Sequence, residues 1–260
     1  MAILEVHSLR KNFGALKAVD DVSFSVEEQS IVGLIGPNGA GKTTLFNLIT
    51  GFIIPDSGKV NFQGQDITKS KPNQRTTKGL SRTFQGTQVF SDLPVWQNVM
   101  ISRFGFIKPN IFTSLLGNKS TKLKRLEAKD WIKTQLEKYN LGHRWEEKAK
   151  DIPFLEQGLL SLVMALSLQP KILFLDEPLA GLNTEESELI IELIRKIRDS
   201  GTTIVLIEHH MKALMTVSEK VIVLHHGNKI AEGTPIEIQN NEDVIQAYLG
   251  KSMKKELSIK

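Results

Sequence analysis

The spacing of apolar residues along the chain predicts strands of two kinds. Residues 3–6 and 22–26 alternate between apolar and polar positions, which is typical of strands that are buried on one face only. Residues 31–35 and 203–207 are apolar nearly throughout, as expected for parallel strands that are covered on both faces. We therefore expect strands and turns in the N-terminal region and a more deeply buried sheet at the centre of the fold.

The composition and periodicity of the chain change near residue 92, where long Lys- and Glu-rich segments have helical spacing. In the segment 123–139, Trp131, Leu136 and Tyr139 recur at helical spacing, which favours a packed core over a cofactor site. We expect an α/β lobe made of residues 1–91 and 161–250. A helical subdomain at 92–160, with an insert at 102–130, would interrupt this lobe, and residues 251–260 would form a polar, frayed tail.

Composition narrows the class of protein. The 260 residues are 40% hydrophobic and 24% charged, which is ordinary for a globular protein with an ample core. No run of eighteen apolar residues is present, so we expect neither a membrane span nor a signal peptide. The lack of cysteine excludes disulfides and cysteine-ligated metals, and it fits a cytosolic location. The net charge of +4 is a mild excess, which favours a solvated surface that could face anionic lipid headgroups over nucleic-acid binding.

One segment has the pattern of a phosphate-binding loop, G-x-x-x-x-G-K-[ST]. It consists of Gly36, Pro37, Asn38, Gly39, Ala40, Gly41, Lys42, Thr43 and Thr44. The strand predicted at 31–35 precedes it, and helical periodicity at 44–50 follows, with Gly51 as the helix stop. A strand, a glycine loop and a helix in this order form the context that the motif requires. The alternative, a glycine turn that matches the motif by chance, is therefore disfavoured.

The chemistry of this phosphate loop predicts a nucleoside triphosphate as ligand. Gly36, Gly39 and Gly41 allow a tight turn that points successive backbone N–H groups at phosphate oxygens, at the positive end of the helix dipole. Lys42 would reach the β- and γ-phosphates, and the Thr43 hydroxyl would bind Mg²⁺.

A second candidate site is the acid pair Asp176 and Glu177, which follows the apolar run 172–175. Parallel sheets bind ligands at the carboxyl ends of their strands, so Asp176 would hold Mg²⁺ through water and Glu177 would act as general base. Two acids at a strand end also commonly cap the next helix, and only the upstream phosphate loop favours catalysis. A histidine just past a strand, such as His209, is by itself more often an ordinary surface residue. A single aromatic residue in a glycine loop, such as Phe13, is by itself more often part of the core.

Taken in order, these segments resemble the ATP-binding subunit of an ATP-binding cassette (ABC) transporter. The resemblance covers the Walker A loop at 36–44, the Walker B strand with Asp176 and Glu177, and a D-loop at 180–183. It implies an α/β fold of the P-loop NTPase class and ABC type, with a mixed sheet core, an antiparallel β subdomain and an inserted α-helical subdomain. The implied cofactors are ATP and Mg²⁺.

The resemblance also implies roles for single residues. Gln85 matches the Q-loop glutamine, His209 matches the switch histidine, and Phe13 occupies the position of the aromatic residue that stacks on adenine. The implied catalytic residues are Glu177, His209, Gln85 and Lys42. The implied metal ligands are Thr43, Gln85 and Asp176.

Several segments resemble the branched-chain amino acid importer type within this family. They are residues 82–85, the insert 102–130, residues 180–183, residues 207–209 and the ending 233–250. None of these segments alone identifies the solute. Importers of urea and short amides are the alternative type within the family. The resemblance implies one nucleotide-binding domain on the cytoplasmic face of the membrane. It works with a second cassette, permease subunits and, indirectly, a solute-binding protein, and not with nucleic acid.

The family signature, Leu-Ser-Gly-Gly-Gln or a close variant, is altered in this chain. Its positions before Asp176 hold Ile152, Pro153, Phe154, Leu155 and Glu156, followed by Gln157 and Gly158. The serine hydroxyl is lost, the glycines are replaced by residues with Cβ atoms, and Glu156 would place negative charge near a triphosphate. The next residues, 159–166, predict an apolar helix that should face solvent and would need a cover.

In this family two cassettes hold two ATP molecules, each between the Walker motifs of one subunit and the signature of the other. An intact Walker side with an altered signature predicts a heterodimer, in which a second cassette completes the hydrolytic site. The alternative is a regulatory or structural cassette with little hydrolysis, although Glu177 and His209 argue against it. A soluble ABC ATPase acting on nucleic acid has the least support.

Overall fold

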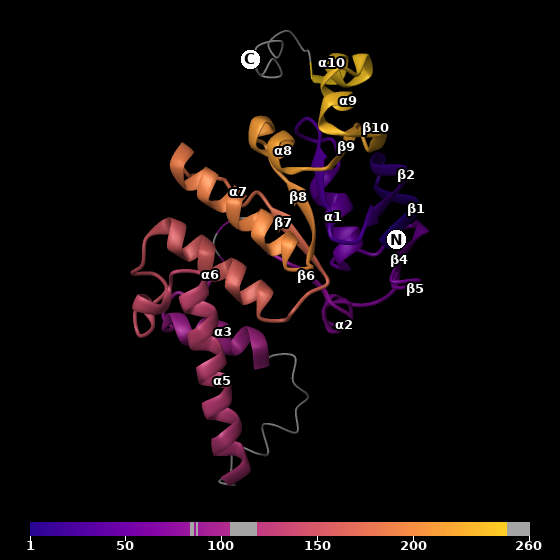
Figure 1. Ribbon diagram of the computed structural model, residues 1–260. Coiled ribbons are helices and arrows are strands. Elements are labelled where there is room, and N and C mark those ends of the chain that lie inside the picture. Colours follow the sequence, from indigo (N-terminus) through magenta and orange to yellow (C-terminus); the bar gives the residue numbers. More distant parts are fainter. Residues whose placement is uncertain (84–85, 87, 105–118, 249–260) are drawn as a thin grey trace. The chain divides into compact units, whose positions relative to one another are not determined.

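The computed structural model describes residues 1–83, 86, 88–104 and 119–248. It forms two compact units (Figure 1). The first joins Met1–Arg82 to Lys171–Lys260, and the second is Thr83–Pro170. Gln85, residues 105–118 of the predicted insert and the predicted tail 251–260 lie outside the described residues.

A mixed sheet of six strands forms the centre of the first unit, in the order β10-β9-β3-β8-β7-β6. Its strands are β3 (Ile31–Ile35), β6 (Leu80–Arg82), β7 (Ile172–Asp176), β8 (Thr203–Ile207), β9 (Lys220–His225) and β10 (Asn228–Gly233). All five residues of β3, β7 and β8 are buried, as their apolar runs predict. These strands are parallel, and Ile207 pairs with both Leu34 and Asp176. The register therefore brings the segments that follow β3, β7 and β8 to one edge of the sheet.

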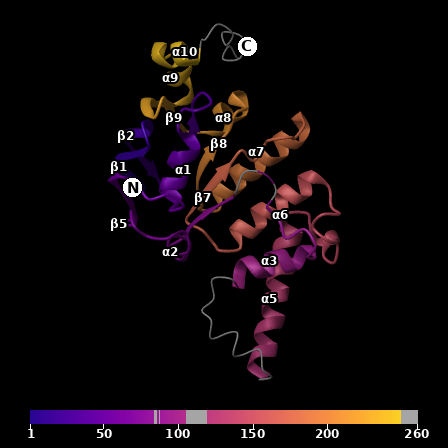
Figure 2. The same ribbon diagram turned by 180° about the vertical axis from the view of Figure 1, so that it is seen from behind.

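Helices cover this sheet, and the helix stop predicted at Gly51 is confirmed. They are α1 (Lys42–Thr50), α2 (Pro72–Thr77), α7 (Thr184–Asp199), α8 (Met211–Val217), α9 (Pro235–Gln239) and α10 (Glu242–Tyr248). Helix α1 begins two residues earlier than the predicted 44–50 and ends at Gly51, whose φ of 86° is left-handed. Helix α7 is capped by Asn183, whose side chain accepts a hydrogen bond from the Glu186 N–H. Both views place α9 and α10 beside the β9–β10 hairpin (Figures 1 and 2).

The antiparallel sheet of the first unit has the order β2-β1-β4-β5. Its strands are β1 (Ala2–Phe13), β2 (Leu16–Glu27), β4 (Ser57–Phe62) and β5 (Gln65–Asp66). The loop expected around Phe13 is wrong, because β1 and β2 continue as a hairpin in which Phe13 pairs with Leu16. The side chains at this end are mostly exposed on both faces, so backbone pairing holds the strands without the alternation that marks a half-buried strand.

The second unit is helical. It contains α3 (Val95–Phe104), α5 (Lys119–Lys138) and α6 (Phe154–Leu166), together with a 3₁₀ turn at Gly142–Arg144. Leu136 and Tyr139 are buried, as predicted, whereas Trp131 is half-buried with the Arg103 guanidinium 3.7 Å from its ring centre. The expectation of a solvent-facing apolar helix is wrong, because α6 packs against α3 and buries Leu159, Leu160, Leu162, Val163 and Ala165. No helix among the residues described here is both long and apolar enough to cross a membrane.

Candidate functional site

The phosphate loop leaves the carboxyl end of β3 and turns directly into α1. Gly41 is the N-cap residue of this helix, with a left-handed φ of 98°. The Lys42 ammonium is buried and donates hydrogen bonds to the carbonyl oxygens of Gly36 and Pro37, at 2.6 and 3.2 Å. Burial lowers the pKa of Lys42, and the charges of Glu177 and Asp176 oppose this shift. The lysine side chain thus lies along its own loop, near enough to Asp176 and Glu177 to feel their charges.

Two glycines of the loop are required by close approach of other strands. A Cβ atom on Gly41 would lie 2.2 Å from the Ala18 carbonyl oxygen of β2, and one on Gly36 would lie 2.3 Å from the Leu224 carbonyl oxygen of β9. On the same side, the Gly227 N–H of the β9–β10 turn donates to the Ala40 carbonyl oxygen at 3.0 Å. The loop is therefore held between the antiparallel sheet and the C-terminal hairpin.

Asp176 ends β7 and is buried together with its ion-pair partner. Arg82, at the end of the neighbouring strand β6, places a guanidinium nitrogen 3.1 Å from Asp176 Oδ2. Another nitrogen of Arg82 donates to Asn47 Oδ1 and Thr50 Oγ1, both on α1. Burial raises the pKa of Asp176, although the nearby Arg82 charge acts in the opposite direction. Arg82 thereby ties the acid to the helix that begins at the phosphate loop.

Glu177 and His209 come together at the same edge of the sheet. Glu177 adopts a left-handed φ of 52°, and its N–H donates to the Ile207 carbonyl oxygen at 2.9 Å. The Glu177 Oε1 atom lies 2.8 Å from Nε2 of His209, which follows β8. The structure thus brings together two residues that the sequence assigned separately, with the histidine able to orient the carboxylate.

Glu208, between β8 and His209, is a site residue that sequence reasoning missed. Its Oε1 accepts a hydrogen bond of 2.7 Å from the Leu179 N–H, just after β7. Burial raises the pKa of Glu208 to about 7, and the backbone N–H donors oppose this shift. An acid between an apolar run and two histidines is the signal that could have identified it.

The remaining predicted residues have mixed outcomes in the structure. Phe13 ends β1 and is 48% exposed, with the Lys11 ammonium 5.7 Å from its ring centre. Thr43 and Thr44 lie in the first turn of α1, where Thr43 is exposed. Gln85 lies outside the described residues. Their binding and catalytic roles stay predictions.

The oxygen donors near the phosphate loop fit Mg²⁺. Within the described part of the chain, no three His, Cys, Asp or Glu side chains gather into a set that could hold a metal. The Thr43 hydroxyl and the Asp176 carboxylate are hard oxygen ligands, and Mg²⁺ commonly takes one or two carboxylates together with the phosphates of a substrate. The donor set therefore suits a metal that arrives with a nucleotide.

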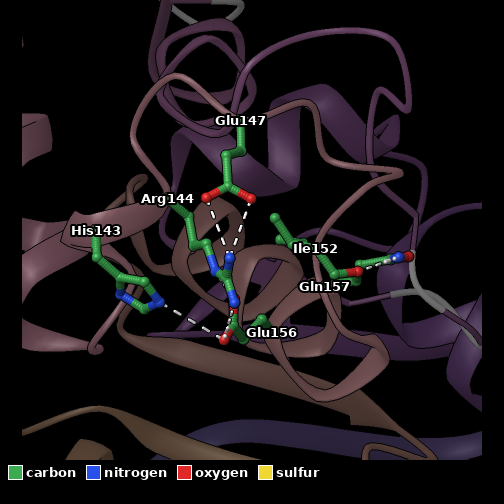
Figure 3. Close-up of polar contacts among 6 residues, drawn as sticks. All are labelled: His143, Arg144, Glu147, Ile152, Glu156 and Gln157. Atoms are coloured by element: carbon green, nitrogen blue, oxygen red, sulfur yellow. Dashed lines mark hydrogen bonds and ion pairs between the residues drawn. The ribbon is translucent and has the colours of Figure 1, made fainter.

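The altered signature in the second unit forms the first turn of α6. Pro153 is its N-cap residue and makes no side-chain capping bond, while Phe154 beside it is 51% exposed. Gln157 Nε2 donates to the Ile152 carbonyl oxygen at 3.0 Å, so the turn is closed by its own side chain (Figure 3). The segment keeps a helical start but presents a proline and an aromatic ring where the family presents small polar residues.

Glu156 has charged and polar partners near this turn. Its carboxylate accepts from Arg144 Nε at 2.7 Å, and His143 Nε2 lies 3.8 Å away. Arg144 also donates to both oxygens of Glu147 at 3.1 Å, so its guanidinium lies between two carboxylates (Figure 3). One arginine between two acids leaves an excess of negative charge when His143 is neutral. The expected unfavourable charge at Glu156 is thus reduced by Arg144 but not removed.

Two family models match the chain. The model described as ABC transporter matches residues 19–180, more than half of the chain. A model described as branched-chain amino acid ATP-binding cassette transporter matches residues 228–253, which include β10, α9 and α10.

Known proteins match along nearly the whole chain. The high-affinity branched-chain amino acid transport ATP-binding protein LivG of Salmonella typhimurium is 39% identical over 251 residues, covering 96% of this chain and 98% of LivG. The corresponding protein BraF of Pseudomonas aeruginosa is 37% identical with the same coverage. A crystal structure of an ATP-binding cassette of an ABC transporter in its ADP conformation matches with a TM-score of 0.84 and 29% identity, covering 96% of this chain and 100% of that one. The predicted fold class is confirmed, and the chain belongs to the nucleotide-binding, transport-coupled ATPases of the ABC transporter family.

Proposed function

We propose that this chain hydrolyses ATP to energise an ABC importer of branched-chain amino acids. The observation that carries the solute is the match of residues 228–253 to the branched-chain amino acid cassette model, together with relatives of that name over the whole chain. The contact between Glu177 and His209 beside an intact phosphate loop supports hydrolysis rather than binding alone.

The phosphate loop binds the nucleotide in this proposal. Backbone N–H groups of the loop 36–44, all but Pro37 having one, surround the phosphates. Lys42 compensates the charge of the β- and γ-phosphates, and Phe13 stacks on the adenine. Thr43, Asp176 and Gln85 would hold Mg²⁺, which would neutralise phosphate charge when bound. Lys42 would exchange its bonds to loop carbonyls for bonds to phosphate oxygens.

Glu177 acts as general base and takes a proton from the attacking water. His209 orients this carboxylate, which its nitrogen already contacts at 2.8 Å, and Gln85 helps to place the water. The base and its orienting group come from neighbouring strands, so the geometry is fixed by sheet register rather than by a loop.

The chain works with a second cassette in a heterodimer. We place one nucleotide-binding domain over residues 1–250, with its α/β lobe at 1–91 and 161–250 and its helical subdomain at 92–160. It attaches to permease subunits at the cytoplasmic face of the membrane and, through them, to a solute-binding protein. The Walker side of this chain pairs with the intact signature of the second cassette, which makes one site hydrolytic.

A regulatory cassette with little hydrolysis is the second candidate. It is favoured by the altered signature, where Pro153 lacks a hydroxyl and Glu156 carries an ion-paired carboxylate. Reconstitution of the purified complex in liposomes separates the two functions. We expect ATP-dependent uptake of leucine, isoleucine or valine, abolished by Glu177→Gln in this chain. Uptake of urea or a short amide, but not of these amino acids, would contradict the proposed solute. Uptake that Glu177→Gln leaves unchanged would favour the regulatory cassette.

A further inference from the structure

The turn between β9 and β10 is bonded to the phosphate loop through its backbone. His225 pairs with Asn228, so His226 and Gly227 form a two-residue turn. Both turn residues have left-handed backbones, with φ of 47° and 80°, as a type I′ hairpin turn requires. The Gly227 N–H donates to the carbonyl oxygen of Ala40, in the middle of the phosphate loop, at 3.0 Å. A turn from the C-terminal part of the chain thus holds one carbonyl of the loop.

The same turn is bonded to the antiparallel sheet. The Gly227 carbonyl oxygen accepts a hydrogen bond of 2.8 Å from the Asp20 N–H of β2. A Cβ atom on Gly227 would lie 2.8 Å from the Lys17 carbonyl oxygen and 3.2 Å from that of Ala18, both on β2. Because these neighbours are backbone atoms, any other residue at this position would displace the turn. The N–H that is bonded to Ala40 would move with it.

The bond to Ala40 sets the direction of the next N–H group of the loop. The Ala40 carbonyl and the Gly41 N–H belong to one planar trans peptide unit, in which they point in opposite directions. Ala40 is buried, and its own N–H donates to the Pro37 carbonyl oxygen at 3.1 Å, so both of its backbone groups are held. The Gly41 N–H therefore points away from Gly227. It lies at the N-terminus of α1, where the helix dipole favours a phosphate.

We propose that Gly227 is a positioning residue for the nucleotide. By holding the Ala40 carbonyl it directs the Gly41 N–H toward the phosphates, and by bonding to β2 it fixes the loop against the sheet that carries Phe13. The loop then binds nucleotide best when the bond from Gly227 is made, and by linkage a bound nucleotide stabilises that bond. This proposal rests on nucleotide binding by the loop and not on the identity of the solute.

The chain offers a matched glycine for a test on the full-length subunit. Gln63 and Gly64 form the two-residue turn between β4 and β5, with left-handed φ of 50° and 73°. A Cβ atom on Gly64 would meet nothing within 4 Å. Gly64→Ala and Gly227→Ala therefore introduce similar backbone strain, but only Gly227→Ala clashes with a neighbouring strand.

We expect Gly227→Ala to weaken binding of a fluorescent ATP analogue about tenfold or more, the range for a lost hydrogen bond to a charged group. Gly64→Ala should bind within about twofold of the wild type. Gly227→Asn is a second variant, because Asn tolerates a left-handed backbone but keeps the clashing Cβ atom, and it should also lose affinity. Wild-type affinity in the Gly227 variants, or an equal loss in Gly64→Ala, would overturn the proposal. A wild type that binds no analogue would instead contradict the proposed ATPase function as well.

Hydrogen exchange of the wild type tests the same coupling without relying on a variant. Addition of Mg²⁺ and ATP should slow exchange of the Gly227 amide severalfold, whereas the Gly64 amide should be unaffected. Exchange at Gly227 that stays unchanged while the phosphate loop becomes protected would contradict the role of Gly227 and leave the ATPase function intact.

Discussion

Glu177 and His209 are in direct contact, with Oε1 of the carboxylate 2.8 Å from Nε2 of the imidazole. They follow β7 and β8, whose register pairs Asp176 with Ile207. The contact therefore results from sheet pairing and from the left-handed turn at Glu177, and it directs the carboxylate toward one edge of the sheet.

The first prediction separates binding from chemistry. Glu177→Gln preserves the shape of the side chain but removes the basic oxygen, so nucleotide affinity should change little while turnover falls about 100-fold or more. Lys42→Ala should instead weaken nucleotide binding, because the loop loses its cation. Nucleotide titration and single-turnover kinetics on the assembled transporter measure both. Equal loss of binding in the two variants would refute the role given to Glu177.

The second prediction concerns the buried ion pair of Arg82 and Asp176. Arg82→Met leaves the carboxylate buried without its cation, which should lower the free energy of unfolding by about 3 kcal/mol or more. Lys196→Met, which breaks an exposed pair with Glu192 on α7, is the control and should change stability little. Urea unfolding of both variants measures the difference. Similar stability of the two would show that the Arg82 pair is not structural.

Glu208 gives a prediction for pH dependence. Its pKa rises from 4.5 to about 7 on folding, so between these values the native state binds more protons than the unfolded chain. Stability should therefore fall as pH rises through this window, by up to about 3 kcal/mol from this one group. Glu208→Gln keeps an acceptor for the Leu179 N–H and should flatten the profile. Urea unfolding at about pH 5 and pH 8 provides the test, and an unchanged slope in the variant would exclude Glu208 as the cause.

The altered signature gives a prediction with its own matched control. Glu156→Gln removes the carboxylate from the signature turn, whereas Glu147→Gln removes the other acid that contacts Arg144. If Glu156 repels a triphosphate, its variant should strengthen ATP-induced self-association about fivefold, with little effect from Glu147→Gln. Turnover of the isolated subunit should stay low, because Pro153 still lacks a hydroxyl. Sedimentation with ATP measures association, and equal gains would point to net charge instead.

Much of the sheet and the phosphate loop could be predicted because local signals agree there. The apolar runs of β3, β7 and β8 indicate burial on both faces, and the glycine pattern between β3 and α1 has a specific mechanism. The β1–β2 hairpin near Phe13 was missed because its pairing depends on backbone bonds between exposed residues, which leave no periodicity. The helix α6 was predicted to start late, because its first turn contains the altered signature.

The buried charges could not be predicted, since their partners are distant in the sequence. Arg82 meets Asp176 only after β6 pairs with β7. Arg75 is buried and donates to the carbonyls of Leu48 and Ile49 at the end of α1, with its pKa lowered to about 10 by burial. In the sequence these arginines look like ordinary surface residues of a basic chain. Only the fold shows that they compensate a buried acid and a helix end.

The most direct test of the account is ATP turnover by this subunit alone and with the cassette that co-purifies with it. The asymmetric arrangement predicts little turnover by the isolated subunit and an increase of about tenfold or more with the partner, abolished by Glu177→Gln in this chain. Turnover by the isolated subunit as fast as that of the complex would contradict the altered signature as a defect and, with it, the heterodimer.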